Sequence, residues 1–482
     1  MKNWGILLFS VAFLLSRIPF LNMGFGSDAD SWIYADTCFA IFKTGTYFVS
    51  RGIGFPGYEL LIALILKIDE MTISGDWFLT NLVAMVSTMA CIILFKKILD
   101  LWKIGNEAIL IITFAFMPII WKNSTNTMDY MLSLMFILLS HYLILYKRYL
   151  LSAIALGFAA GVRPNNGVML LPLLYLVWKE NRINAVRYSM IFFIVSFSFF
   201  IPFLSVYKTF TLEQYRNYMN LPSTFVMYLM KTGYRMFYEF LGFDAALFLC
   251  IVLPFSKKGL KKFLQSLKDG DTAVIFSTIT ILSFLTLFFK YPHQSEYLIP
   301  SIYCLLILAG QFFNKKTLIA FSALITINGF FIIPGIDFSF GSTGNVTIRP
   351  SPAEEGPFLT EIKKRKEMIK FQKIFPPALL KNKSIVILHE YHALYVYFNR
   401  HKILNNGAYF DSKGRLICLD QVYDPQKDIY ITYLAMGTLS SLIPEYNIYY
   451  IPCSVRLIKG RSNIDLLEYN PVLLKGLEPL DY

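Results

Sequence analysis

Long apolar runs separated by short polar breaks make up the chain from its first residues to about residue 334. A helix needs ~20 mostly apolar residues to cross the ~30 Å hydrocarbon core of a bilayer. The pattern is typical of an α-helical polytopic membrane protein. On this criterion we predict about eleven transmembrane helices, at residues 5–23, 77–95, 106–121, 130–146, 150–162, 164–178, 188–206, 241–255, 272–289, 297–313 and 317–334.

One further apolar run, residues 55–68, is shorter than a span, at ~14 residues. It is bracketed by Pro56 and by the charged residues Lys67, Asp69 and Glu70. Helices that lie in the membrane interface carry a short apolar stretch with charged flanks. We therefore expect this run to lie in the interface, and the orientation of every later loop depends on that expectation.

The basic residues between the runs predict the orientation of the chain. Residues 1–334 contain 27 Lys and Arg residues, of which 16 fall in short loops on one side of the bundle and 11 in longer loops on the other. The positive-inside rule places the first side and the N-terminus in the cytoplasm, and the odd number of spans places the C-terminal residues outside. No small-residue cleavage site follows Leu21, so we expect a retained first helix in the plasma (inner) membrane.

The composition agrees with a membrane protein. Apolar residues make up 55% of the 482 residues and charged residues 16%, whereas an average soluble protein has about 25% charged residues. This excludes a disordered chain and argues against a purely soluble enzyme. The net charge of +13 lies mostly in the loops that set orientation. We therefore expect membrane lipid as a partner and no nucleic acid.

Residues 335–482 resemble an ordinary soluble domain that follows the membrane domain of residues 1–334. We predict a small α/β extracytoplasmic domain, with helical stretches at 391–400 and 434–443. A Gly-, Ser- and Pro-rich stretch, residues 341–357, predicts a linker. Residues 361–373 form a basic amphipathic helix that lies either on anionic headgroups or in solvent. The predicted strands are Ser384–Leu388, Arg415–Leu419, Asp428–Tyr433 and Ile448–Leu457.

Cysteine and histidine residues indicate little chemistry. Cys418 and Cys453 lie in the outer domain, where a disulfide is chemically allowed, and the sequence leaves their pairing open. His389 and His392 are three residues apart, whereas the helical zinc motif needs four, so we predict no zinc site there. The other four cysteines fall in or near apolar segments, where we expect small buried side chains: Cys38, Cys91, Cys250 and Cys304.

The first outer loop, about residues 24–76, carries two carboxylates close to the end of the first span, Asp28 and Asp30. A carboxylate beside hydrocarbon loses hydration, which raises its pKa and suits a general base. The alternative is structural, because Ser27 or Asp28 can cap a helix that begins at Ala29.

Asp129 and Arg163 lie at the outer ends of apolar runs. Asp129 either takes part in chemistry or complements the dipole of the helix that follows it. The Arg163 guanidinium either holds a phosphate through paired hydrogen bonds or snorkels to the interface. The helix centres are nearly free of ionisable residues, which argues for chemistry at the membrane surface rather than ion passage. Four further polar residues cluster at the outer end of span 297–313: Lys290, His293, Glu296 and Tyr297.

Five short motifs occur in order along residues 5–310. They are Asp30 with Tyr34-Ala35 and Thr44-Gly45, Arg51-Gly-Ile-Gly-Phe55-Pro56, Thr127-Met-Asp129, Gly157-Phe-Ala-Ala-Gly161-Val-Arg163-Pro164, and Glu296-Tyr297-Leu-Ile-Pro300. In this order they resemble the GT-C superfamily of membrane glycosyltransferases, which contains protein O-mannosyltransferases and the aminoarabinose transferases of lipid A. Two positions depart from the family pattern: Ile53 stands where proline is common, and Glu296 where arginine is common.

The resemblance implies a GT-C-like bundle and an inverting hexosyl or pentosyl transferase. Such an enzyme moves a sugar from a polyprenyl-phosphate-linked donor to a glycan, lipid or protein acceptor on the outer side. By the same resemblance Asp30 is the catalytic acid/base, with Asp28 as its alternative, and Asp129 orients the acceptor or a metal. The three aspartates are also the candidate ligands of a divalent metal such as Mg or Mn.

The resemblance also implies which residues bind substrate. Arg51 and Arg163 would hold the lipid phosphate, with Tyr34 beside them. Because Glu296 replaces the usual arginine, Lys290 or His293 would supply the missing cation there, next to Tyr297.

Two other functions remain open. A lipid-linked oligosaccharide flippase needs a continuous polar path, which the helix centres disfavour. A Wzy-like polysaccharide polymerase usually carries arginines in a large late outer loop, and residues 208–240 contain Arg216 and Arg235. The glycosyltransferase hypothesis predicts that the side chains of Asp28 or Asp30, Asp129 and Arg163 line one outer cavity.

Overall fold

The structure is a computed structural model that describes most of the helical part of the chain and short segments of the C-terminal part. The described residues are 3–51, 54–72, 77–207, 225–255, 257–292, 294–332, 335–340, 346–374, 384–387, 409–410, 416–418, 421–424, 429–432, 447–450 and 467–468.

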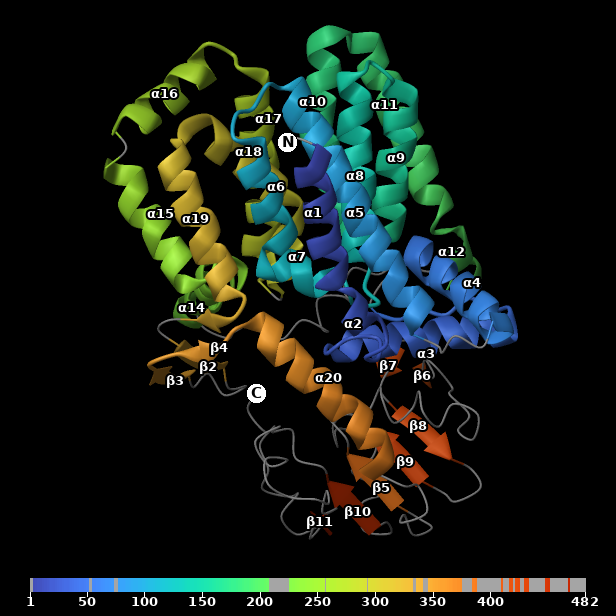
Figure 1. The fold of residues 1–482 in the computed structure, drawn as a ribbon. Helices are drawn as coiled ribbons and strands as arrows, with labels where there is room; N and C mark the ends of the chain where they lie inside the picture. The colour runs from blue at the N-terminus through green and yellow to red at the C-terminus, as the bar shows by residue number, and fades with distance from the viewer. Residues whose placement is uncertain are drawn as a thin grey trace.

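Helices make up the first group of elements. In chain order they are α1 (Asn3–Leu15), α2 (Ile18–Leu21), α3 (Ala29–Thr44), α4 (Pro56–Thr72), α5 (Phe78–Leu101), α6 (Glu107–Phe116), α7 (Pro118–Asn123), α8 (Tyr130–Leu145), α9 (Tyr149–Val162), η1 (Pro164–Met169), α10 (Leu170–Glu180), α11 (Arg182–Ser198) and α12 (Ile201–Tyr207). Helix α8 packs against α5 and α9, and α9 packs against α11. Figure 1 shows α3 lying across one end of this bundle.

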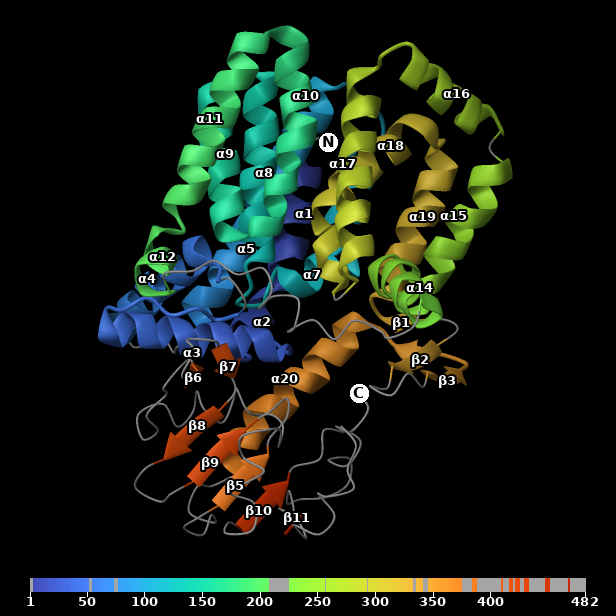
Figure 2. The ribbon, with the colours of Figure 1, turned by 180° about the vertical axis from the view of Figure 1, so that it is seen from behind.

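A second group of helices completes the bundle. It contains α14 (Phe225–Gly233), the π-helical segment η2 (Tyr234–Phe240), α15 (Phe243–Phe255), α16 (Lys257–Lys268), α17 (Thr272–Lys290), η3 (Ser295–Leu298), α18 (Ile299–Phe312) and α19 (Lys315–Asn328). Helix α17 contacts α10, and α18 contacts α6 and α8. In both views α16 lies at the end of the bundle opposite α3 (Figure 1, Figure 2).

Three described helices are long and apolar enough to cross a membrane: Phe78–Leu101, Thr272–Lys290 and Ser295–Phe312, the last of which joins η3 to α18. Shorter apolar helices lie at Leu8–Leu21, Glu107–Phe116, Tyr130–Leu145 and Tyr149–Val162. The described part of the chain is therefore mostly helical, with helices suited to a membrane. The number of eleven spans stays a prediction.

Several predicted apolar runs are interrupted near the end of the bundle that carries α3. The run 5–23 breaks between α1 and α2, and the run 106–121 breaks before Pro118, which begins α7. Proline is tolerated in the first turn of a helix but disrupts a helix interior. At the first break, the buried Arg17 donates hydrogen bonds to the Ala115 carbonyl oxygen and to Ser124 Oγ, the latter at 3.2 Å. This contact joins the end of α1 to the break between α6 and α7.

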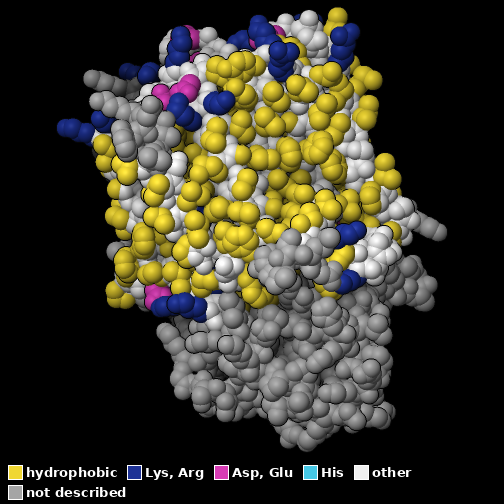
Figure 3. All heavy atoms as spheres, turned by 45° about the vertical axis from the view of Figure 1, so that its right-hand side comes forward, with side chains coloured by type: hydrophobic (Ala, Val, Ile, Leu, Met, Phe, Trp, Pro, Cys, Tyr) yellow, Lys and Arg dark blue, Asp and Glu magenta, His cyan; other side chains and the backbone are white. Residues whose placement is uncertain are grey.

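The sides of the helical part expose apolar side chains. Figure 3 shows them as a broad band over the helices, with Lys and Arg side chains gathered toward the ends. Leu64, Phe193 and Phe197 are among the large hydrophobic residues in contact with solvent, at 56%, 47% and 66% exposure. An exposed apolar surface of this kind is suited to lipid, which agrees with a membrane location.

Two short antiparallel pairs of strands follow α19. Strand β1 (Phe331–Ile332) pairs with β4 (Glu354–Glu355), and β2 (Gly335–Phe340) pairs with β3 (Val346–Ser351). The linker prediction is therefore wrong for most of the described residues 346–357. The β-branched residues Val346, Thr347 and Ile348 favour a strand, and they outweigh the neighbouring Ser and Pro residues.

A mixed five-stranded sheet occupies the C-terminal part. Its order is β11-β10-β5-β9-β8, with β10, β5 and β9 parallel. The strands are β5 (Ser384–Ile387), β8 (Gln421–Asp424), β9 (Ile429–Thr432), β10 (Asn447–Tyr450) and β11 (Leu467–Glu468), while β6 (Tyr409–Phe410) and β7 (Leu416–Cys418) form a separate pair. The predicted strands coincide with β5, β7, β9 and β10. The predicted helices at 391–400 and 434–443, the pair His389 and His392, and Cys453 lie outside the described residues, and the division at residue 334 stays a prediction.

Helix α20 (Pro357–Ile374) lies between the bundle and this sheet in both views (Figure 1, Figure 2). The Phe358 ring packs on Trp121, with ring centres 4.4 Å apart. Glu361 and Arg365 are buried, while Lys363 and Lys366 are exposed. The expectation of a helix that contacts only headgroups or solvent is therefore wrong for one face, because that face is docked on protein.

Arg365 is the main polar anchor of α20. It pairs with Glu361 at 2.6 Å and donates to the carbonyl oxygens of Phe20 and Thr125, both at 3.0 Å. Glu361 in turn accepts hydrogen bonds from the backbone N–H and the hydroxyl of Ser27. One helix thus holds two loops of the bundle at the end that carries α3.

Replacing this anchor is expected to release α20. Arg365→Ala leaves Glu361 buried without its cation, and breaking a buried ion pair costs about 3–5 kcal/mol. We expect a lower melting temperature of the purified protein and faster tryptic cleavage within α20. Lys366→Ala, an exposed change on the same helix, serves as the control; equal protease resistance of the two variants would contradict the docking role of Arg365.

Candidate functional site

Four charged side chains alternate in sign at the end of the bundle that carries α3. Arg51 Nη1 binds Asp30 Oδ2, and Arg51 Nη2 lies 4.0 Å from Asp129 Oδ1. Arg163 Nη1 donates to both oxygens of the Asp129 carboxylate, at 2.9 and 2.7 Å. The side chains of Asp129 and Arg163 are 0% and 4% exposed, and those of Arg51 and Asp30 are 11% and 20% exposed. The row therefore runs from a buried end at Arg163 to an accessible end at Asp30.

Asp28 explains why α3 begins where it does. Its carboxylate caps the helix by accepting a hydrogen bond from the Asp30 backbone N–H at 3.0 Å. The helix-cap alternative is thus confirmed for Asp28, whereas Asp30 lies in the first turn with its side chain free to reach Arg51. The two aspartates have different structural tasks although only Ala29 separates them.

Glu59 holds the loop that presents Arg51. Its buried carboxylate accepts hydrogen bonds from the Ser50 backbone N–H at 2.8 Å, the Phe55 backbone N–H at 3.0 Å and the Tyr47 hydroxyl. Gly54 closes the turn, with a φ of +76° and its N–H bonded to the Arg51 carbonyl oxygen at 2.7 Å. A side chain at Gly54 would collide with Tyr47, so the turn requires glycine.

Asp129 and Arg163 come from the ends of two packed helices. Asp129 precedes α8 but makes no side-chain cap hydrogen bond, and Arg163 follows α9. The guanidinium carbon of Arg163 lies 4.0 Å from the ring centre of Tyr130 and 5.1 Å from that of Tyr297. The snorkelling alternative is wrong for Arg163, because its guanidinium is buried and pairs with Asp129. The dipole alternative stays open for Asp129, which is the N-cap residue of α8.

Contacts between the segment before α3 and the segment before α8 bring Asp30 and Asp129 together. The Thr127 N–H donates to the Phe25 carbonyl oxygen at 2.7 Å. Asn81 bridges the same loops, since its side chain donates to the Gly24 carbonyl oxygen at 2.7 Å and accepts from the Thr127 hydroxyl at 2.9 Å. These polar contacts are buried, so they fix the distance between the two loops.

Polar neighbours complete the surroundings of Asp30. Gln294 Nε2 donates to Asp30 Oδ2 at 3.3 Å, and its carbonyl oxygen accepts from the Tyr130 hydroxyl at 2.5 Å. Tyr34 lies 2.9 Å from Arg51 Nη2 through its hydroxyl. The sequence indicated Tyr34, but it carried no signal for Gln294 or Glu59, whose partners are known only from the fold.

The residues of the cluster predicted near residues 290–297 have different surroundings in the structure. Tyr297 lies against Arg163. Glu296 is buried and pairs with Lys122 at 3.2 Å, so Lys122 is a cation next to this glutamate among the described residues. Lys290 is exposed at the end of α17 with its ammonium over the Tyr291 ring, and His293 lies outside the described residues.

Charge and burial shift the pKa values of two groups at this site, Asp28 and Arg51. Burial, followed by the charge of Asp30, raises the pKa of Asp28 to about 6, although Lys122 opposes the shift. For Arg51, burial would lower the pKa, but the carboxylates, Asp30 foremost, outweigh it and hold the pKa above its usual value. Arg51 therefore stays charged, while Asp28 changes charge near neutral pH.

The described residues do not fit the expected metal site. No group of three or more His, Cys, Asp or Glu side chains in the described part of the chain is arranged to hold a metal ion. Arg51 and Arg163 occupy the neighbourhood of the Asp30 and Asp129 carboxylates where a cation would bind. We therefore derive no step through a metal.

No protein-family model and no curated protein sequence matches the chain. Among solved structures, it is similar to ArnT from Cupriavidus metallidurans in the apo state, with 14% identity, a TM-score of 0.45 and coverage of 64% of this chain. It is also similar to the same protein bound to undecaprenyl phosphate, with 13% identity, a TM-score of 0.49 and coverage of 68% of this chain. The matches span 59% and 64% of the ArnT chains. ArnT is an aminoarabinose transferase of the GT-C type, the group that the sequence motifs resemble.

The raised pKa of Asp28 predicts a pH-dependent stability. A carboxyl group whose pKa is higher in the folded state favours folding when protonated, and this contribution is lost as the pH rises from about 4 through about 6. Asn caps helices as well as Asp and does not titrate. We expect Asp28→Asn to raise the melting temperature at pH 8 by more than it does at pH 4. The exposed change Asp269→Asn at the opposite end is the control, and a pH-independent effect of Asp28→Asn would contradict the prediction.

Proposed function

We propose that the protein is a membrane glycosyltransferase that moves a sugar from a polyprenyl-phosphate-linked donor to an acceptor hydroxyl. The observation that carries the proposal is Arg51, which lies between two carboxylates and whose buried Nε has no hydrogen-bond partner among the described residues. A buried donor without a partner costs about 1–3 kcal/mol or more when charged. A phosphate oxygen would satisfy it, next to a carboxylate that can accept a proton.

Two arginines suit the departing phosphate. The sugar-linked phosphate carries one negative charge, and the polyprenyl phosphate that leaves carries a second as the bond breaks. Guanidinium groups bind phosphate through paired hydrogen bonds. Arg51 and Arg163 would stabilise the charge that develops on the leaving group, which is where stabilisation accelerates a reaction.

Asp30 is the proposed general base. The acceptor oxygen attacks the anomeric carbon, Asp30 accepts the hydroxyl proton, and the bond from the anomeric carbon to the phosphate oxygen breaks with both electrons staying on the phosphate. One displacement of this kind inverts the anomeric configuration. Arg51 holds Asp30 in the described arrangement, and a bound phosphate would compete for Arg51. Donor binding would thereby release Asp30 as a base.

Supporting roles follow from the contacts. Asp129 orients Arg163, and Gln294 and Tyr34 orient Asp30 and Arg51. A lipid-linked donor also accounts for the position of the site at the end of an apolar belt (Figure 3). In this proposal that end faces outward, with the N-terminus in the cytoplasm, as the basic loops predict.

Removing the proposed base tests the reaction. We expect Asp30→Asn to lower sugar transfer by about 10²–10⁴-fold, the usual contribution of a general base. The measurement is release of undecaprenyl phosphate from a panel of undecaprenyl-phosphate sugars by the full chain in liposomes. Asp100→Asn, an exposed change at the opposite end, controls for expression and folding. Wild-type transfer by Asp30→Asn would overturn the assignment, and lipid-linked sugar crossing the bilayer without transfer would favour a flippase.

Replacing the proposed phosphate ligand tests donor binding. We expect Arg51→Gln to weaken binding of undecaprenyl phosphate by about 10–100-fold, since a hydrogen bond to a charged group contributes about 1.5–3 kcal/mol. Lys290→Gln is the matched control, because Lys290 is an exposed cation at the end of α17 whose ammonium lies over the Tyr291 ring. An equal loss in both variants would mean that outer cations attract the phosphate without a specific site.

A further inference from the structure

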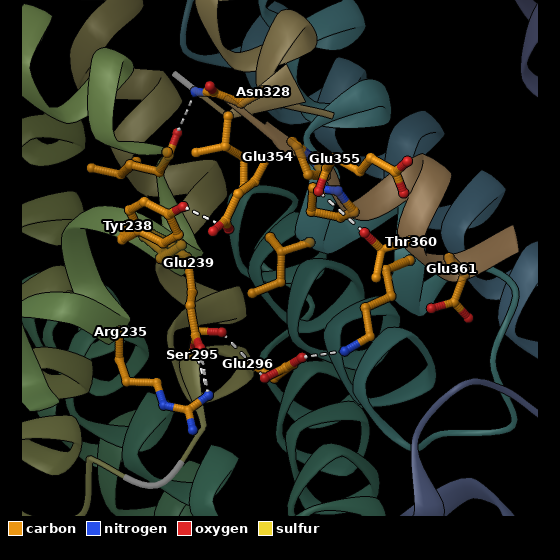
Figure 4. Close-up of a pocket in the computed structure, with 18 of the residues that line it drawn as sticks. Arg235, Tyr238, Glu239, Ser295, Glu296, Asn328, Glu354, Glu355, Thr360 and Glu361 are labelled. Atoms are coloured by element: carbon orange, nitrogen blue, oxygen red, sulfur yellow. Dashed lines mark hydrogen bonds and ion pairs between the residues drawn. The ribbon is translucent and has the colours of Figure 1, made fainter. Parts of the chain in front are cut away.

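A cavity of about 320 Å³, lined by polar and apolar residues, lies near the start of α3. Residues of α7, η2, η3, β4 and α20 line it, and so does Ser27, which directly precedes Asp28 in the sequence. Figure 4 shows Tyr238 and Glu239 on one side of the cavity and Thr360 and Glu361 on the other. The volume is at the lower end of the ~300–1,000 Å³ range of small-molecule sites.

Some charges around the cavity neutralise each other. Glu296 pairs with Lys122 at 3.2 Å, and Arg235 pairs with Glu239 at 2.7 Å. The Arg235 side chain, which the polymerase alternative relied on, is therefore engaged, while Arg216 lies outside the described residues. These two pairs are neutral in total, and the lining also contains Glu354, Glu355, Glu361 and Lys364.

Two side chains with acceptor oxygens line the cavity, Asn328 and Glu354. Asn328 is 2% exposed and lines the cavity, and within the described residues its Oδ1 has no hydrogen-bond partner. Glu354 also lines the cavity, and its carboxylate accepts a hydrogen bond from the Tyr238 hydroxyl at 3.2 Å. A ligand that donates several hydrogen bonds fits this set.

Two unusual backbone features line the cavity, a π-helix and a glycine with a positive φ. Residues Tyr234–Phe240 form a π-helix, a rare geometry that is found frequently at functional sites. Gly242 has a φ of +82°, and a side chain there would collide with Asn328. The chain thus keeps a wide turn and a glycine where they place Tyr238, Glu239 and Asn328 at the cavity.

We propose that this cavity binds the sugar ring of a carbohydrate acceptor and delivers its hydroxyl group to the aspartates at the start of α3. The inference rests on the proposed function and adds the class of acceptor. Hydroxyl groups of a sugar would donate to Asn328 Oδ1 and Glu354. The donor phosphate would lie on the other side of these aspartates, at Arg51 and Arg163.

Two variants test the cavity without altering the four charges. Glu354→Gln removes a charged acceptor and keeps the shape, and Thr360→Trp fills the cavity from α20. The full chain is reconstituted in liposomes with an undecaprenyl-phosphate sugar, and release of undecaprenyl phosphate is measured with water alone and with increasing methyl glucoside, galactoside or mannoside. Glu107→Gln, at the opposite end of the bundle, is the control.

We expect the half-saturating glycoside concentration to rise about tenfold in Glu354→Gln, as for the loss of one buried hydrogen bond to a charged group. Thr360→Trp is expected to abolish stimulation by glycosides, while release with water alone and the KM for the donor stay unchanged. A changed donor KM would assign the cavity to the donor sugar and overturn the proposal, as would glycoside saturation equal to wild type in both variants. If the wild-type protein neither binds undecaprenyl phosphate nor releases it from any donor, the proposed function fails first.

Discussion

The contact between Asp129 and Arg163 is the interaction on which the site depends. Both side chains are almost completely buried, and each would be strongly unfavourable there without the other. The pair joins the residue before α8 to the residue after α9, so it also fixes how the ends of these two helices meet. Arg51 and Asp30 extend the pair outward, and each added charge is opposite to its neighbour.

The two arginines and two aspartates of the row sum to zero charge, and in the proposed function Arg51 also binds an anion. In the proposed function, a phosphate near Arg51 would compete with carboxylates rather than with water, so its binding would change the state of Asp30. The low exposure of the row strengthens such electrostatic effects compared with those at an open surface. The arrangement accounts for why arginine, with its planar group of five donors, stands at both cationic positions.

Sequence patterns predicted the charged row well, because isolated charges stand out against apolar runs. Asp30, Arg51, Asp129 and Arg163 lie together, although their mutual pairing could not be read from spacing and none of them lines the cavity beside Ser27. Gln294 was missed because its partner Asp30 is 264 residues away, and amides give no pattern of their own. Lys290 lies exposed at the end of α17 beside the Tyr291 ring, and its role as a cation at the site stays a prediction.

The contact between Ser27 and Glu361 joins residues 334 positions apart in the chain. Ribosomes add about 5–20 residues per second, so tens of seconds separate the synthesis of the two partners. The turn that carries Asp28 and Asp30 is therefore synthesised long before α20, the helix that contacts it. Completion of the site is tied to the last stage of biosynthesis, and a chain truncated before α20 would carry all four charges of the row without the brace that holds their loops.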